Sequence, residues 1–168
     1  MGQCAGNAPR ADSIPVRVKV RLQPAAADEG ERLREIAIAA KASWGYDLER
    51  VRHWAAMGDF SPAGLRQKDV VVASVGTNAV GWIGVIRQQE VLWLDDLWVE
   101  PSWMGKGIGR RLFQHGQPGA TVGRDSTGVG GGTKRHRVLY EKMGGRYARD
   151  GELSVWGRVN PVMALELT

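Results

Sequence analysis

Residues 94–101 read LDDLWVEP, and residues 104–113 continue with MGKGIGRRLF. The apolar residues of this stretch first read as a strand, alternating glycines then form a tight turn, and an amphipathic helix follows. Glycines let the backbone approach a ligand closely, and the N–H groups at a helix N-terminus favour negative charge. The stretch therefore predicts a diphosphate-binding turn, although its glycine spacing matches neither G-x-G-x-x-G nor G-x-x-x-x-G-K-[ST].

Length and composition indicate one globular domain. The chain has 168 residues, of which 43% are hydrophobic, enough for a sizeable core. No apolar run approaches the roughly 20 residues of a membrane helix. A single cysteine, Cys4, cannot form an internal disulfide. We therefore expect no membrane partner and a cytoplasmic location, with residues 1–13 as a flexible leader and residues 14–168 as the domain.

The net charge of +5 does not by itself indicate a nucleic-acid partner. Residues 116–138 hold four basic residues and one acidic residue, which accounts for +3 of that charge. The remainder is nearly balanced, and no basic helix face with interleaved aromatic residues is present. We therefore expect no nucleic-acid binding, whereas salt-dependent retention on DNA would favour the opposite interpretation.

Hydrophobic periodicity predicts an α/β domain of the α+β type. Val16–Leu22 alternates strictly, as a strand does, and Asp28–Ala40 places apolar residues at helical spacing. Further strands are expected at residues 70–75, 80–86, 91–99, 146–149 and 162–167, and further helices at residues 48–57, from residue 107 onward, and at residues 139–143.

These residues resemble the GNAT acetyltransferase superfamily, enzymes that move an acetyl group from acetyl-coenzyme A to an amine. The resemblance extends over roughly residues 16–167 and is most specific from Leu97 to Gly109. There the family shows L-x-V-x-P, then a basic or amide residue, two variable positions, Gly, any residue and Gly. The resemblance implies a single domain with a mixed, mostly antiparallel sheet and helices on both faces. Its fourth and fifth strands would splay apart to admit the pantetheine arm.

The same resemblance implies acetyl-coenzyme A as the cosubstrate. The backbone of the strand would pair with the pantetheine arm, and the backbone N–H groups of the turn would hold the diphosphate. Met104 departs from the family's basic or amide residue, which puts in doubt only a side-chain contribution from that position. The implied cofactor-binding residues are Leu97, Trp98, Val99, Met104, Gly105, Lys106, Gly107, Ile108, Gly109 and Arg110.

A second match is LYEKMGG at residues 139–145, which resembles the family's F-Y-x-x-x-G-F. Tyr140 then occupies the position where the family often has a tyrosine near the sulfur of coenzyme A, and it could protonate the departing thiolate. The alternative is a core phenol whose hydroxyl is hydrogen-bonded. Residues 157–167 are similar to the closing strand of many members, whose preceding loop borders the acceptor site.

Asp95 and Asp96 lie within an otherwise apolar strand. Alternation predicts that their side chains point to opposite faces, and burial of a charge without a purpose is costly. We expect at least one of them to face the acceptor cleft and take part in catalysis, Asp95 first, with Asp96 and Glu100 behind it. The alternative is a carboxylate at a strand end that pairs with a nearby arginine.

Trp44, Tyr46 and Asp47 lie where the family has loops that contact the acceptor, so we expect them to bind substrate. Aromatic rings together with an acid suit a cationic amine. The alternative is a hydrophobic cap over the first helix. The three histidines are scattered, and no spacing of His, Cys or Asp indicates a metal, so no metal is expected.

Residues 116–138 depart from the family pattern, with seven glycines, no helical period and no strand alternation. A structureless loop of this length is uncommon in a compact domain. Read one base later, a back-translation of residues 129–138 permits LEAEPNATGF, which closely resembles the family's fifth strand and the start of its next helix. We therefore hypothesise a pair of compensating frameshifts, in the gene or in its reading. As written, the segment is expected to be irregular, and it lacks an asparagine that the family often uses near the cofactor.

The sequence thus predicts a transferase, an acyltransferase that moves the acetyl group of acetyl-coenzyme A to an amine by direct transfer in a ternary complex. Cys4 is badly placed to form a covalent acetyl-enzyme. The acceptor is a small amine, an antibiotic, or a terminus or lysine of a peptide or protein. The alternative is a catalytically impaired coenzyme A-binding or regulatory protein, damaged or repurposed in residues 116–138. Family members often dimerise, and a homodimer is compatible with the resemblance.

Overall fold

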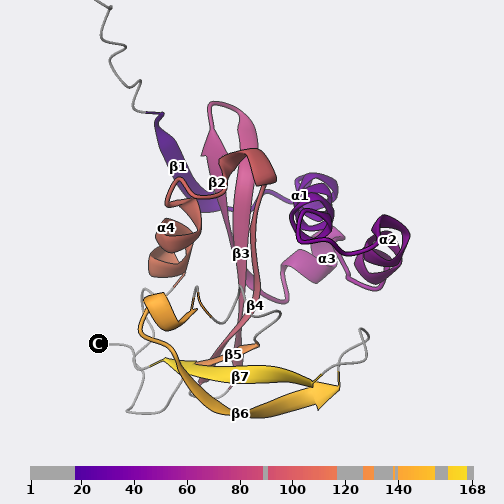
Figure 1. Cartoon of the computed structure of the whole chain (residues 1–168). Helices are drawn as coiled ribbons and strands as arrows, with labels where there is room; N and C mark the ends of the chain where they lie inside the picture. The colour runs from indigo at the N-terminus through magenta and orange to yellow at the C-terminus, as the bar shows by residue number, and fades with distance from the viewer. Residues whose placement is uncertain are drawn as a thin grey trace, which may run out of the picture.

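Seven strands among the described residues form one mixed sheet at the centre of the protein (Figure 1). The computed structural model describes residues 18–88, 91–116, 127–130, 138, 140–153 and 159–165. The strand order is β1-β2-β3-β4-β5-β7-β6, in which β4 and β5 are parallel and the other neighbours are antiparallel. The elements are β1 (Val20–Pro24), α1 (Gly30–Ala42), α2 (Leu48–Ala56), α3 (Pro62–Leu65), β2 (Asp69–Val75), β3 (Asn78–Gln88), β4 (Val91–Val99), η1 (Pro101–Trp103), α4 (Ile108–His115), β5 (Thr127–Gly130), β6 (Arg146–Leu153) and β7 (Val159–Leu165).

Helices cover both faces of the sheet. Figure 1 shows α1, α2 and α3 on one side of β3 and β4, and α4 on the other. α1 buries a stripe at i, i+3, i+4 and i+7 spacing, from Leu33 to Ala40, against Trp82 of β3. On the opposite face, α4 buries Ile108 and Leu112 against β3 and β4. The sheet therefore has a hydrophobic core on each face, as expected from the family resemblance.

β4 contains a β-bulge at Asp95. Gly84 of β3 is opposite Asp96, and the next residue of β3 is opposite Leu94, so Asp95 has no partner position in β3. The packing agrees, because Leu94 and, three residues later, Leu97 both pack on the α4 face. The extra residue breaks the simple alternation on which the sequence prediction for the two aspartates depends.

β4 and β5 are registered at a single pair of Cα positions, those of Leu94 and Val129. β4 continues beyond Leu94 as far as Val99, and along that length its other edge is occupied by β3. The backbone edge of residues 97–99 therefore faces the space between β4 and β5. This arrangement agrees with the splayed fourth and fifth strands that the family resemblance implies.

The predicted elements are largely confirmed, with ends shifted by a few residues. β2, β3, β4, β6 and β7 correspond to predicted strands, and α1, α2 and α4 to predicted helices. The first predicted strand, at residues 16–22, corresponds to β1, although residues 16 and 17 lie outside the described residues. α3 is absent from the prediction because four residues beginning with a proline carry no readable period.

The predicted short helix before the paired glycines is confirmed in its described part. Residues 140–142 are helical, and Gly144 follows with a φ of 93°. The backbone N–H of Gly145 donates to the carbonyl of Tyr140 at 2.8 Å, which closes the helix end. The position of Tyr140 at the start of this turn is therefore fixed by the glycines that follow it.

The unusual segment at residues 116–138 contains one described strand. β5 runs from Thr127 to Gly130 and pairs antiparallel with β7, so the expectation of an irregular segment is wrong for these four residues. Residues 117–126 and 131–137, like the expected leader at residues 1–13, lie outside the described residues. Within the described part of the chain, no helix has the length and hydropathy needed to span a bilayer.

Candidate functional site

The turn between β4 and α4, residues 104–110, has the backbone of an anion-binding cradle, and we call it the glycine turn. Gly105 and Gly107 have φ values of 75° and 80°, a region that other residues adopt only with strain. An added Cβ at either glycine would meet no atom within 4 Å, so both face open space. The first N–H bonded within α4 is that of Arg111, which donates to the carbonyl of Gly107. The N–H groups of residues 108–110 precede it and have no acceptor inside the helix.

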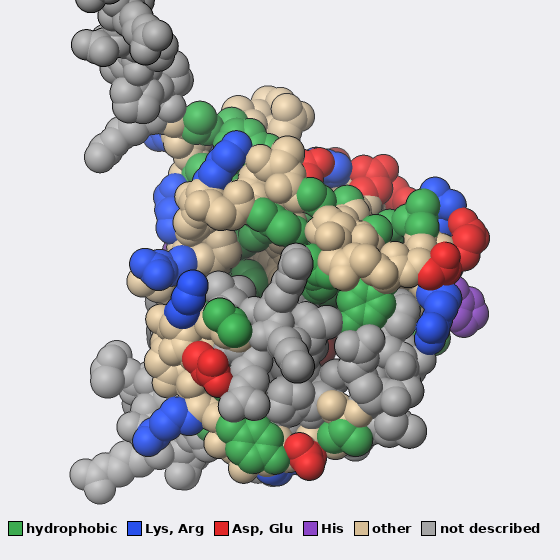
Figure 2. Space-filling model, in the orientation of Figure 1, with side chains coloured by type: hydrophobic (Ala, Val, Ile, Leu, Met, Phe, Trp, Pro, Cys, Tyr) green, Lys and Arg blue, Asp and Glu red, His purple; other side chains and the backbone are tan. Residues whose placement is uncertain are grey.

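The side chains around the glycine turn carry positive charge. Lys106 and Arg110 are exposed, and the Lys106 ammonium lies 4.4 Å from the centroid of the Trp103 ring. Figure 2 shows Lys and Arg side chains gathered on the side of the molecule where α4 lies. A helix N-terminus flanked by these charges suits a phosphate-bearing ligand.

Met104 departs from the family pattern for a reason that the packing explains. Its side chain is partly buried and packs against the core on the α1 face, together with Trp44 and Trp54. A basic or amide side chain would have to leave that core to reach the turn. Met104 therefore contributes its backbone to the glycine turn, while its side chain anchors the turn to the sheet.

The side chains of residues 97–99 of β4 pack on both faces of the sheet. Leu97 and Val99 pack on the α4 face, while Trp98 is buried on the α1 face. Among the described residues, their backbone pairs with residues 81–83 of β3 alone, and the opposite edge, toward β5, is the one along which an extended ligand would lie. Only residues 100–103, which include η1, separate the strand edge from the glycine turn in the sequence, so one long ligand could contact both.

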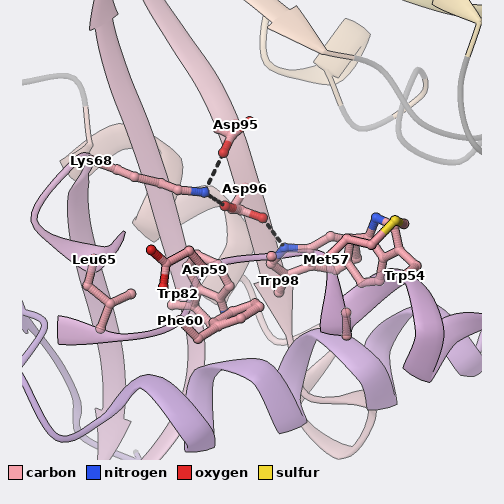
Figure 3. A pocket seen from close by; sticks show the side chains of 12 residues that line it. Trp54, Met57, Asp59, Phe60, Leu65, Lys68, Trp82, Asp95, Asp96 and Trp98 are labelled. Carbon is pink, nitrogen blue, oxygen red and sulfur yellow. Dashed lines mark hydrogen bonds and ion pairs between the residues drawn. The ribbon is translucent and has the colours of Figure 1, made fainter. Parts of the chain in front are cut away.

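Asp95 and Asp96 bind the same cation. The ammonium of Lys68, just before β2, donates to Oδ2 of Asp95 and, at 2.6 Å, to Oδ2 of Asp96 (Figure 3). The prediction of opposite faces is therefore wrong, because the bulge at Asp95 lets both carboxylates, the acid pair, reach one partner. The alternative of a pairing partner is close to what is found, although the partner is a lysine and not an arginine.

Asp96 is the more enclosed member of the acid pair. Its side chain is 13% exposed, against 43% for Asp95. The indole N–H of Trp98 donates to Asp96 Oδ1 at 2.8 Å, so both carboxylate oxygens of Asp96 accept hydrogen bonds. A Cβ added at Gly84 would approach Asp96 Oδ2 and Lys68 Cδ to 3.3 Å, so glycine there leaves room for the pair.

Burial and neighbouring charges shift the pKa values of Asp96 and Lys68 in opposite directions. Burial raises the pKa of Asp96 above its usual range, and the nearby Lys68 ammonium and the Trp98 hydrogen bond only partly offset this effect. Burial also lowers the pKa of Lys68, but the charges and hydrogen bonds of Asp96 and Asp95 outweigh it, so the pKa of Lys68 is raised. A carboxylate with a raised pKa beside a cavity is a candidate proton acceptor.

A cavity of about 440 Å³ lies against the acid pair on the α2 and α3 side of the sheet, and Figure 3 shows it from close by. The Lys68 ammonium, Asp95 and Asp96 form one of its walls. Aromatic rings from α2, from the segment before α3 and from the sheet form much of the rest. Its described lining residues are Trp54, Ala55, Met57, Gly58, Asp59, Phe60, Leu65, Lys68, Trp82, Asp95, Asp96 and Trp98.

Tyr140 lies on the other face of the sheet. It is buried and packs with the core of α4, β3 and β4. Burial first, and the charge of Asp96 second, raise the pKa of its phenol well above the usual value. The phenol therefore keeps its proton at neutral pH.

The three residues expected to bind the acceptor are not among the described residues that line this cavity. Asp47 is the N-cap of α2, where its carboxylate accepts the backbone N–H of Arg50 at 3.0 Å. Trp44 stacks on Trp98 with ring centroids 5.7 Å apart, and the Tyr46 ring lies 5.2 Å from the Lys41 ammonium. Trp44 therefore packs on a ring of the cavity wall, and Tyr46 shares the Lys41 ammonium with Trp54 and Trp98.

Several cavity residues are missing from the sequence prediction. Lys68 is separated from the acid pair by 27 and 28 residues in the sequence, and the residues next to it give no sign that it binds the two carboxylates. Trp54 and Phe60 follow the predicted acceptor loop, so a wider reading of that aromatic region would have included them. His53 and His115 lie on different helices, and the described residues contain no group of three or more His, Cys, Asp or Glu that could hold a metal.

Comparisons with known proteins support the family resemblance. Residues 66–144 match the family model described as an acetyltransferase (GNAT) domain, and the matched span contains Lys68, the acid pair, the glycine turn and Tyr140. No curated protein matches the chain. The part of the chain that forms the candidate site is therefore similar to an acetyltransferase (GNAT) domain.

Solved structures of the same fold cover most of the chain. PaiA N-acetyltransferase from Thermoplasma acidophilum in complex with coenzyme A is 15% identical, with a TM-score of 0.71 over 89% of this chain and 99% of the other. A GCN5-related N-acetyltransferase from Rhodopseudomonas palustris is 19% identical, with a TM-score of 0.70 over 88% and 95%. The ribosomal-protein-S18-alanine N-acetyltransferase from Escherichia coli is 15% identical, with a TM-score of 0.61 over 88% and 94%. The family model at residues 66–144 and the shared fold together confirm the resemblance of this chain to the GNAT acetyltransferases.

Proposed function

We propose that this protein transfers the acetyl group of acetyl-coenzyme A to a primary amine by direct attack within a ternary complex. The observation that supports this most is the closeness in sequence of the strand edge at residues 97–99 and the glycine turn, which only residues 100–103 separate. An extended pantetheine arm would pair with the edge, and the diphosphate would bind the N–H groups that open α4. The thioester then comes to the middle of β4, beside the acid pair.

The amine has to lose a proton before its nitrogen can attack the thioester carbonyl. Asp96 accepts that proton, directly or through a water molecule, because its enclosed carboxylate lines the cavity and its pKa is raised by burial. A backbone N–H on the open edge of residues 97–99 stabilises the negative charge that develops on the carbonyl oxygen. The new bond joins the amine nitrogen to the acetyl carbon.

The bond from the acetyl carbon to sulfur then breaks, and the leaving thiolate needs a proton. We assign that donation to Tyr140, whose phenol is protonated at neutral pH; the resulting phenolate regains a proton from solvent, and Asp96 releases to solvent the proton that it took from the amine, which restores the enzyme. The burial of Tyr140 on the α4 face, away from the acceptor cavity, suits a group that serves the cofactor side of β4. Proton removal and proton donation are thereby assigned to opposite faces of the same strand.

The test is release of free thiol from acetyl-coenzyme A on addition of a mixed amine pool, compared between the wild type and Asp96→Asn. We expect release by the wild type and a loss of about a hundredfold or more in the variant, with acetyl-coenzyme A affinity retained. Acetyl-coenzyme A binding without any amine-dependent release by the wild type would contradict the proposal. That result would favour the alternative of a coenzyme A-binding protein without transferase activity.

A further inference from the structure

We propose that the acceptor is a small aromatic amine that carries no carboxylate. It would bind with its ring among the aromatic side chains of the cavity and its amino group at the acid pair. This inference rests on the proposed function, because it names the substrate class of the same site. Three properties of the cavity carry it: its ring-lined walls, the balance of its charges, and the affinity of its rings for an ammonium group.

The walls of the cavity are aromatic and held in place. The indole N–H of Trp82 donates to the carbonyl of Leu33 at 2.9 Å, and Phe60 meets Trp82 edge to face with centroids 6.0 Å apart. Trp98 is fixed by its hydrogen bond to Asp96 and by packing against Trp54, with ring centroids 5.4 Å apart. Preformed ring faces favour a flat apolar group. A volume of about 440 Å³ lies toward the small end of ligand pockets, which suits one ring system on a short chain.

The charged side of the cavity favours a cation and disfavours an anion. Among the described lining residues, three carboxylates (Asp59, Asp95 and Asp96) stand against the single ammonium of Lys68. Hydrogen bonds from Ser61 lower the pKa of Asp59, so this carboxylate stays ionised. The Lys68 ammonium is shared between the two members of the acid pair. A carboxylate on the acceptor would therefore enter a net negative environment, where like charges repel.

The rings beside the cavity already bind an ammonium group of the protein itself. The Lys41 ammonium lies 4.3 Å from the centroid of the Trp54 ring and 5.5 Å from that of Trp98. Both of these tryptophans also line the cavity. Their electron-rich faces therefore attract cations, and they would draw a protonated amine toward the acid pair before it loses its proton.

The experiment compares amines that differ by one feature each, using the full chain with saturating acetyl-coenzyme A. Phenethylamine is the reference, propylamine lacks the ring, phenylalanine adds a carboxylate, and spermidine and a short peptide represent other amine classes. We expect kcat/KM for phenethylamine to exceed that for propylamine and that for phenylalanine by at least about tenfold each, as loss of the ring or addition of a repelled charge predicts.

Two tryptophan variants show whether the preference comes from the cavity. Trp54→Ala removes a wall, and we expect the ratio of kcat/KM for phenethylamine to kcat/KM for propylamine to fall by about fivefold or more, because only phenethylamine also loses a contact with its ring. Trp93→Ala is the matched control, because Trp93 lies on β4 and is not among the described lining residues. It should leave the ratio unchanged.

Preference for spermidine, the peptide or phenylalanine would overturn the inference and leave the proposed function intact. Binding of phenethylamine to the complex with coenzyme A is measured separately by calorimetry. Saturable binding that Trp54→Ala weakens supports the inference even if no acetyl transfer occurs, which would count against the proposed function alone. Absence of phenethylamine binding by a protein that binds coenzyme A overturns the inference.

Discussion

Replacement of Lys68 by methionine should move the pH profile of the reaction. The ammonium of Lys68 is the common partner of the acid pair, and its side chain is 23% exposed. Methionine keeps most of the apolar length of the lysine and removes the charge. Two neighbouring carboxylates then remain without the cation that separates their charges.

The size of the shift follows from the contacts. An opposite charge close to a carboxyl group lowers its pKa by about 1–3 units, and a like charge raises it. Loss of Lys68 should therefore raise the pKa of Asp96 by at least about 1 unit, which corresponds to 1.36 kcal/mol per unit. Asp95 is 43% exposed, so solvent screens part of the repulsion and the lower end of the range applies.

The direction of the shift in the pH profile depends on which protonation state of Asp96 is active. The reaction needs the ionised carboxylate, so activity falls as the pH drops through the pKa of Asp96. A higher pKa in Lys68→Met makes that loss begin at a higher pH. The assay is kcat/KM for one amine between pH 5.5 and 9, in which the ionisation of the amine itself affects wild type and variant equally.

Two controls separate this electrostatic effect from loss of folding. Removal of one partner from a buried ion pair costs about 3–5 kcal/mol, so chemical denaturation has to show that Lys68→Met is folded under the assay conditions. Lys68→Arg keeps the positive charge, so its activity should fall at low pH over the same range as that of the wild type. The double variant Lys68→Met with Asp95→Asn also removes the neighbouring negative charge, so part of the shift in the pH profile should disappear. If folded Lys68→Met loses activity at low pH over the same range as the wild type, Lys68 does not control the pKa of Asp96.

Three further predictions follow from the structure. Tyr140→Phe should lower kcat by roughly a hundredfold without changing the affinity for acetyl-coenzyme A, as measured by steady-state kinetics and calorimetry, because it removes only the proton for the thiolate; an unchanged kcat would leave Tyr140 as a core phenol. Asp47→Ala should lower the free energy of unfolding by about 1 kcal/mol, measured with urea, and leave kcat/KM for the amine acceptor unchanged, because Asp47 caps α2; a large loss of kcat/KM for the acceptor would restore its expected role in substrate binding. Resequencing of the DNA across codons 110–142 should show a gained and a lost base at the two borders of residues 116–138; a clean read in this gene and in close relatives would contradict the frameshift hypothesis.

Local signals in the sequence were sufficient for most of the fold. The helical stripe from Leu33 to Ala40 and the alternation in β2 need no distant information, so their positions are predicted to within a few residues. Gly105 and Gly107 likewise indicate the glycine turn, because a positive φ favours a residue without Cβ. These features depend on neighbours in the chain, which is why sequence reading finds them.

The acceptor cavity is formed by residues that are far apart in the sequence, and their contacts cannot be predicted from local patterns. Lys68 meets the acid pair across two strands, and the bulge that brings Asp95 and Asp96 together is a register shift against Gly84. The prediction of opposite faces fails for this reason. Asp47 shows the converse case, since an acid beside aromatic residues resembles a ligand-binding group but serves as a helix cap.

Calorimetric titration of acetyl-coenzyme A into the purified chain shows whether the cosubstrate binds the glycine turn, on which the proposed function depends. Gly107→Glu adds a carboxylate where the diphosphate would bind, at a φ of 80°. Gly76→Glu is the matched control, because Gly76 also has a positive φ (59°), has open space around it, and lies in the β2–β3 hairpin outside the glycine turn. We predict micromolar binding by the wild type and by Gly76→Glu, and loss of binding in Gly107→Glu. Equal affinity in all three proteins, or no binding by a folded wild type, would contradict the account.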